Sequence, residues 1–193
     1  MNIRDFRNPS HPVDPLFLNR WSPRAMSGEE LSEAELMTLF EAARWAPSSN
    51  NNQPWRFFYG RRNTPRWDLF FNLLTESNKL WTHRAAVLVV VASKTTFDSG
   101  KFARTHSYDA GAAWGHLALQ GSLMGLVVHG MQGFDYDRAK MELAMPDFFQ
   151  VEAMIAIGRP GKKEALPEHL QEREFPSSRK PLADIIVEGL WKA

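Results

Sequence analysis

The apolar residues of this chain recur at two different spacings, which predict a mixture of helices and strands. Leu36, Leu39 and Ala43 lie on one helical face, and Ser32 with Glu35 before them forms a possible capping box. A mainly β-branched run over 87–91 instead indicates a buried strand. Across the chain, the spacing predicts helices over 32–45, 64–74, 107–124 and 135–143, and strands over 55–59, 87–91, 126–129 and 151–157.

The order of these elements favours an α+β fold over a doubly wound sheet. Strands and helices do not alternate as regular βαβ units would, so we expect a mostly antiparallel or mixed central sheet flanked by helices. The length suits a single domain over 1–193, with 1–19 as an N-terminal arm. We interpret the polar loop 94–105, which carries Phe97 and Phe102, as a lid, with a plain surface loop as the alternative.

Composition removes several classes of chemistry. The chain has no cysteine, which excludes thiolate nucleophiles, disulfides and cysteine-based metal sites, so redox chemistry needs a bound cofactor. The 6 histidines form no HExxH motif, and we expect no metal site. Lys and Arg number 23 against 22 Asp and Glu, which gives no basic excess for nucleic acid. With no signal segment or membrane-spanning run, we expect a cytoplasmic protein that binds neither nucleic acid nor a membrane.

Two polar segments are candidate ligand sites. Arg20 and Arg24, with Ser22 between them, can present forked donors and a hydroxyl group to one phosphate. The segment 47–53 places hydroxyl and carboxamide side chains between two tryptophans, and such neutral groups suit a planar heterocycle with amide edges. The alternatives are a solvated arm for the first segment and an ordinary surface loop for the second.

Two glycine-containing segments complete the candidate chemistry. The predicted helix 107–124 carries pairs of glycines four residues apart, a spacing typical of close packing against a helix or a subunit. The segment 130–135 lies between a predicted strand and a predicted helix, where glycines expose backbone N–H groups to an anionic or electron-rich ligand. A generic turn is the alternative for this second segment.

Taken in this order, the segments resemble the FMN-dependent nitroreductase family. The most specific match is the stretch 42–55, AARWAPSSNNNQPW, and the similarity extends from about Arg20 to Trp191. Further matches are Arg20-x-Ser22, the start DAGAA at 109–113, Gly125-Leu126, 130–135, 157–160 and 179–182. The resemblance implies an intertwined homodimer that holds FMN in two sites at its interface. It also implies that the extension 159–193 wraps around the partner subunit.

The resemblance also implies which residues contact FMN. The phosphate and ribityl side would be held by Arg20, Trp21, Ser22, Arg24 and Arg179. From the other subunit, Pro47, Ser48, Ser49 and Asn51 would approach the flavin. Asn78 would contact the pyrimidine side, and Gln132 with Gly133 would present backbone N–H groups near N5. Some relatives carry a lysine where this chain has Ser177.

The activity implied by the resemblance is that of an NAD(P)H-dependent FMN oxidoreductase. Hydride would pass from a transient NAD(P)H to flavin N5 and then to an electron-poor small molecule, a nitroaromatic or a quinone, in a ping-pong scheme. No side chain is required as an obligatory acid or base. The alternatives are a flavoenzyme of the same fold with other chemistry (reductive dehalogenation, flavin fragmentation or dehydrogenation) and a flavin-binding or sensing protein without physiological turnover.

Overall fold

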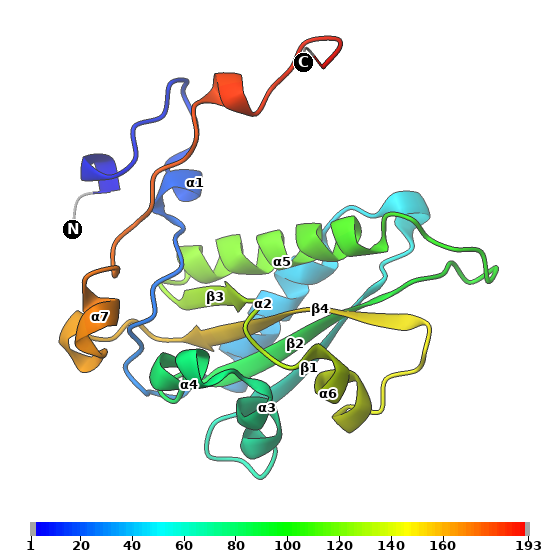
Figure 1. The fold of residues 1–193 in the computed structure, drawn as a ribbon, viewed down its shortest axis with the longest axis horizontal. Helices are drawn as coiled ribbons and strands as arrows, with labels where there is room; N and C mark the ends of the chain where they lie inside the picture. The colour runs from blue at the N-terminus through cyan, green and yellow to red at the C-terminus, as the bar shows by residue number, and fades with distance from the viewer. Residues whose placement is uncertain (1–2, 192–193) are drawn as a thin grey trace.

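A four-stranded antiparallel sheet forms the centre of the computed structural model, which describes residues 3–191 (Figure 1). The strands are β1 (Trp55–Arg61), β2 (Val87–Lys94), β3 (Val127–Met131) and β4 (Phe149–Gly158), in the spatial order β1-β2-β4-β3. All four strands coincide with predicted ones, and each extends a few residues beyond the predicted range at one or both ends. The expected α+β class with an antiparallel sheet is therefore confirmed.

The helices cover both faces of this sheet. They are α1 (Pro15–Asn19), α2 (Glu33–Arg44), α3 (Trp67–Leu73), α4 (Glu76–Thr82), α5 (His106–Leu123), α6 (Tyr136–Glu142) and α7 (Glu168–Gln171). Short 3-10 turns occur at Ile3–Asp5, Ser49–Asn51, Lys163–Ala165 and Leu182–Asp184. One apolar core lies between the sheet and α2 with α5, and a second between the sheet and α3, α4 and α6. The short helices α1, α4 and α7 were not predicted from the sequence.

The two central strands explain why the fold is well determined. Every residue of β2 except the last is buried, because a helical layer covers each face of the sheet. Val90 pairs with Met154 and Val91 with Ala153, and the register then shifts so that Ala92 pairs with Val151. This irregularity places one extra residue on β4 between the paired positions and bends the strand locally.

Helix α5 runs along the sheet, and its glycines have two different surroundings. A Cβ on Gly121 would lie 2.4 Å from Val128 Cγ2, so this glycine allows the helix to approach β3 closely. Gly111 and Gly115 meet no described atom within 4 Å of such a Cβ. The helix ends before Gly125, whose φ of +67° suits the left-handed position after a helix. The predicted packing role therefore applies to Gly121, which packs on a strand of its own chain.

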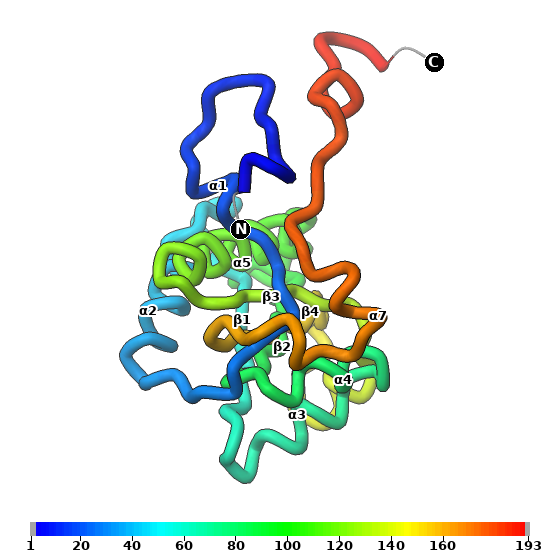
Figure 2. The backbone as a smooth tube through the Cα atoms, turned by 90° about the vertical axis from the view of Figure 1, so that its left-hand side faces the viewer, coloured from blue at the N-terminus to red at the C-terminus, as the bar shows by residue number. Residues whose placement is uncertain are grey.

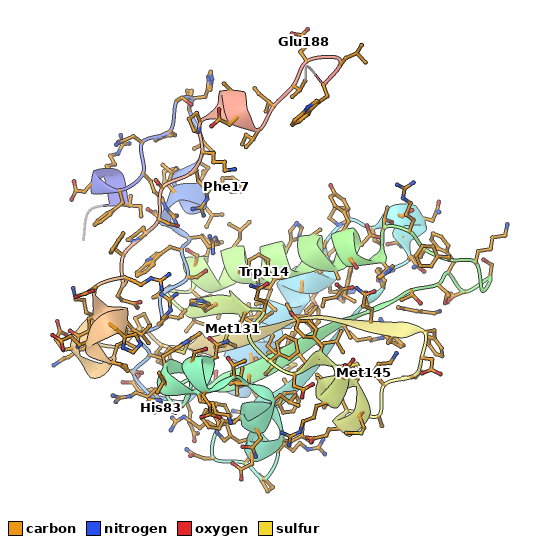
Figure 3. All side chains as sticks on the ribbon, in the orientation of Figure 1. Phe17, His83, Trp114, Met131, Met145 and Glu188 are labelled. Carbon is orange, nitrogen blue, oxygen red and sulfur yellow. The ribbon has the colours of Figure 1, made fainter. Side chains whose placement is uncertain are left out.

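Two arms extend from the body on the same side (Figures 1 and 2). The N-terminal arm carries the exposed side chain of Phe17 (Figure 3), and the C-terminal arm passes beside it. The rings of Phe6 and Phe175 stack with 5.8 Å between their centroids, which joins the two arms. Beyond this contact the C-terminal arm exposes six large apolar side chains, Leu182, Ile185, Ile186, Val187, Leu190 and Trp191. No helix within residues 3–191 is long and apolar enough to cross a membrane.

Candidate functional site

Arg20 and Arg179 come from opposite arms and lie close together. Arg20 follows α1, is partly buried, and donates from Nη1 to Ser22 Oγ at 3.2 Å. Burial and the positive charge of Arg179 lower the pKa of Arg20. Arg179 is exposed and donates from Nη1 to Ser177 Oγ at 3.0 Å. Within residues 3–191 neither guanidinium group forms an ion pair, so two like charges face each other without a counter-ion.

Arg24 differs from these two arginines because it has an acidic partner. The buried Glu174 accepts hydrogen bonds at Oε1 from the backbone N–H groups of Arg24, at 2.7 Å, and Ala25, at 2.8 Å. Its other oxygen, Oε2, lies 3.9 Å from Arg24 Nη1. Glu174 therefore fixes the backbone at Arg24 and offsets its charge. The charge that remains available for a ligand resides on Arg20 and Arg179.

His129 of β3 ties this arginine segment to the sheet. Its Nδ1 lies 2.8 Å from the carbonyl oxygen of Pro23, so Nδ1 carries the proton and donates. The ring packs on Trp81 with 4.5 Å between centroids. Burial lowers the pKa of His129 to about 4, and the charges of Arg24 and Arg20 act in the same direction. The imidazole is thus neutral near pH 7, and it anchors the segment as a neutral donor.

Downstream of His129, the turn at Gln132 and Gly133 meets Asn78 of α4. The Gly133 carbonyl oxygen accepts from Asn78 Nδ2 at 2.9 Å and from Thr75 Oγ1 at 3.0 Å. Asn78 Oδ1 in turn accepts from Trp81 Nε1 at 3.2 Å. A Cβ on Gly133 would lie only 2.6 Å from Asn78 Nδ2, so this position leaves no room for a side chain. The structure thus brings the predicted residues Asn78 and Gly133 together.

The backbone of the same turn has donors to spare. Among the described residues, the N–H groups of Gln132 and Gly133 donate to no acceptor, and the Gln132 side chain is exposed. Just before the turn, Gly130 packs against Trp114: a Cβ there would lie 3.0 Å from Trp114 Cζ2. Figure 3 shows Trp114 on α5 and Met131 at the end of β3. The turn is therefore supported on both sides while its two N–H groups stay free for a ligand.

The other predicted segment, 47–51, lies elsewhere in this chain. The Ser49 N–H donates to Oδ2 of Asp109, near the start of α5, at 3.1 Å. Ser48 Oγ accepts from the Gln53 N–H at 3.0 Å, while Pro47 and Asn51 are exposed. Asn50 and Asn51 have φ values of 50° and 53°, a left-handed conformation that asparagine tolerates. The segment is thus an ordered loop at the N-terminal end of α5.

The length of α5 separates the two groups of predicted residues. Arg20 and Trp21 line a cavity of about 360 Å³ together with Ala118 and Ser122, near the C-terminal end of the helix. Thirteen residues of helix between Asp109 and Ser122 correspond to about 20 Å. Arg20, Trp21, Ser22, Arg24 and Arg179 therefore gather at one end, and Pro47, Ser48, Ser49 and Asn51 lie at the other.

Sequence reasoning missed residues that hold the site in place. Arg7, Trp81 and Glu174 contact predicted site residues or their backbone, and His129 contacts the carbonyl oxygen of Pro23, which lies between two of them. None belongs to a local motif: Arg7, His129 and Glu174 act on segments distant in sequence, and Trp81 acts on Asn78, three residues before it. The signal that would find them is a buried polar or charged side chain in an otherwise apolar or extended stretch.

Comparisons with known proteins place the chain in a family. The model of the nitroreductase family matches residues 18–64. A solved structure of an oxidoreductase containing FMN is 48% identical, covers 96% of both chains and has a TM-score of 0.93. An uncharacterized 15.4 kDa protein of Mycolicibacterium smegmatis is 30% identical over 148 residues, which is 70% of this chain and 97% of that protein. An NADH dehydrogenase of Thermus thermophilus is 24% identical over 91% of this chain and 93% of its own length. This chain belongs to the nitroreductase family of oxidoreductases.

Proposed function

We propose that this chain is an FMN-dependent oxidoreductase that receives electrons from NAD(P)H and delivers them to an electron-poor small molecule, such as a nitroaromatic or a quinone. The observation that carries the proposal is the pairing of two uncompensated arginines, Arg20 and Arg179, with a turn of free backbone donors at Gln132 and Gly133. The similarity to an oxidoreductase containing FMN and to an NADH dehydrogenase supports it.

The arginine end suits the phosphate group of FMN. Arg20 and Arg179 offer planar forked donors, which match phosphate oxygens, and their mutual repulsion is relieved by a dianion between them. Ser22 adds a hydroxyl group already oriented by Arg20. Arg24 contributes less charge because Glu174 offsets it. Trp21 lines the cavity beside Arg20 and gives the ribityl side an apolar wall.

The turn end suits the ring system. Bound FMN supplies reversible two-electron chemistry, which no side chain of this cysteine-free chain offers. The free N–H groups of Gln132 and Gly133 are preorganised donors for negative charge that develops on a reduced ring. Asn78 binds the Gly133 carbonyl oxygen through its amide nitrogen, and the second hydrogen of that amide would contact the pyrimidine edge of the flavin.

The separation along α5 supports a homodimer with shared sites. Pro47, Ser48, Ser49 and Asn51 stand about 20 Å away from the arginine end, a distance that a second copy of the chain would bridge. The exposed face of α5 at Gly111 and Gly115 and the apolar C-terminal arm provide surface for this contact. In this arrangement the extension 159–193 wraps around the partner subunit. The last two residues of this extension and the first two residues of the arm 1–19 lie outside the described part of the chain.

Steady-state turnover tests the proposal. FMN-loaded protein is mixed with NADH or NADPH and with a nitroaromatic or a quinone, and oxidation of the nicotinamide is followed by absorbance. We expect oxidation that depends on both FMN and the acceptor. Protein that binds FMN but is reduced by neither nicotinamide would contradict the enzymatic part of the proposal, and would favour a flavin-binding protein without turnover.

A further inference from the structure

Arg7 is a buried arginine that no part of the proposed site explains. It stands in the N-terminal arm, between the turn Ile3–Asp5 and α1, in a stretch whose other residues are mostly exposed. Only 8% of its surface is exposed, whereas arginine is almost never buried unless it is paired. Among residues 3–191, however, Arg7 forms no ion pair. Its burial therefore needs another cause.

The hydrogen bonds of Arg7 supply that cause. Nε donates to the carbonyl oxygen of Ser177 at 3.0 Å, while Nη1 donates to the carbonyl oxygens of Leu18, at 2.6 Å, and Arg20, at 2.8 Å. One planar side chain thus joins the N-terminal arm, the end of α1 and the C-terminal arm. Two of the three acceptors lie at the arginines proposed to bind phosphate. One is the carbonyl oxygen of Arg20 itself, and the other belongs to Ser177, two residues before Arg179.

The charges that act on the pKa of Arg7 are those of two other arginines. Burial, followed by the charges of Arg179 and Arg20, lowers the pKa of Arg7. Its Nη2 group donates to no residue within the described part of the chain. Within residues 3–191, three guanidinium groups therefore converge without pairing to a carboxylate, an arrangement that repels itself unless an anion is present. The arms are thus held together by hydrogen bonds and by the Phe6–Phe175 stack against this repulsion.

We propose that Arg7 is a positioning residue that clamps the two arms so that Arg20 and Arg179 face one phosphate group. This inference rests on the proposed function, with the phosphate ester of FMN as the anion that offsets the three charges. Arg7 acts at the phosphate end alone, because its contacts are confined to the arms and the end of α1. It should therefore set the preference of the protein for FMN over riboflavin, which has the same ring system and no phosphate.

The test compares two ligands and two variants. Dissociation constants for FMN and for riboflavin are measured by quenching of flavin fluorescence with wild type, Arg7→Ala and Arg66→Ala. Arg66 is an exposed arginine before α3, far from the arms in sequence, and controls for loss of one positive charge. For Arg7→Ala we expect FMN binding to weaken roughly tenfold to hundredfold and riboflavin binding by less than about threefold. Arg66→Ala should change neither constant.

Each other outcome has a distinct meaning. An unchanged FMN constant in Arg7→Ala overturns the inference, and so does an equal weakening for both flavins, which indicates a general structural role. Wild type that binds neither flavin contradicts the proposed function instead.

If Arg7→Ala fails to fold, wild type alone still provides a test. Amide hydrogen exchange is measured in the segments 16–22 and 175–180 with FMN and with riboflavin. We expect FMN to protect both segments more strongly than riboflavin does, because only FMN carries the phosphate group. Equal protection by the two flavins overturns the role of Arg7.

Discussion

The central sheet and the two arms of this chain differ in how their polar and apolar groups are satisfied. In the sheet, β2 and β4 bury aliphatic side chains on both faces, and the strand pairs satisfy the backbone. At the arms, three arginines converge without a counter-ion among the described residues, and several apolar side chains face solvent. The sheet is complete within one chain, whereas under the proposed function the arms would contact a ligand and a partner. We therefore expect stability to depend on the sheet, and cofactor binding to depend on the arms and on the turn at Gln132 and Gly133.

The largest expected effect is on stability and comes from the sheet. Ile155 of β4 is fully buried in the core under α2 and α5. Replacement with alanine leaves a cavity and should lower the free energy of unfolding by about 2–5 kcal/mol, as measured by urea denaturation. The molecules that remain folded should bind FMN with unchanged affinity. A large loss of FMN affinity with little loss of stability would break the division between sheet and arms.

The next effect is a pH dependence of stability that arises at His129, the residue of the sheet that contacts the arginine segment. Its folded pKa is about 4, whereas its ordinary value is 6.5, so the unfolded chain binds a proton first as the pH falls. The contribution of His129 to stability is constant above pH 6.5 and is lost between pH 6.5 and 4, by at most about 3 kcal/mol. Urea denaturation at pH 7 and pH 5 measures it.

His129→Gln is the matched variant for this prediction. Glutamine does not titrate, so the fall in unfolding free energy between pH 7 and pH 5 should become smaller in the variant. An equal fall in wild type and variant would show that other groups cause the pH dependence.

The third prediction is a loss of FMN affinity with little change in the stability of the protein. Arg20→Ala removes a proposed phosphate ligand and should weaken FMN binding by about 1.5–3 kcal/mol. The free energy of unfolding of the flavin-free protein should change little, because Arg20 is repelled by Arg179 in the absence of an anion. Isothermal titration with FMN measures the affinity, and Arg66→Ala is the control. Equal effects of the two variants would remove Arg20 from the phosphate site.

The smallest expected effect arises at the turn. Gly133→Ala brings a Cβ within 2.6 Å of Asn78 Nδ2 and should displace that amide, at a cost to FMN affinity of about 1–3 kcal/mol. A double-mutant cycle with Asn78→Ala tests the cause. If the clash is responsible, Gly133→Ala should cost less in the Asn78→Ala background. Additive losses would indicate that Gly133 matters for another reason.

The predictable part of this molecule is the part in which neighbours along the chain decide the structure. The aliphatic run over 87–91 predicted β2, and the capping box at Ser32 and Glu35 is present at the start of α2. The helix α4 was missed because its seven residues show no repeated apolar spacing; only Trp81 and Thr82 are buried.

Part of the candidate site was beyond sequence reasoning because it depends on tertiary contacts. The family resemblance named Arg20 and Arg179, but no local pattern shows that the buried Arg7 joins their two arms. Ser177 accepts from Arg7 through its carbonyl oxygen and from Arg179 through its hydroxyl group. These contacts between the arms appear only in three dimensions.

Binding of FMN tests the central claim most directly. Flavin-free protein is titrated with FMN while flavin fluorescence is recorded, and the thermal unfolding midpoint is then measured at saturation. We predict quenching that saturates at one FMN per chain, together with a raised unfolding midpoint. Fluorescence that stays unquenched and a midpoint that FMN does not raise would contradict the account.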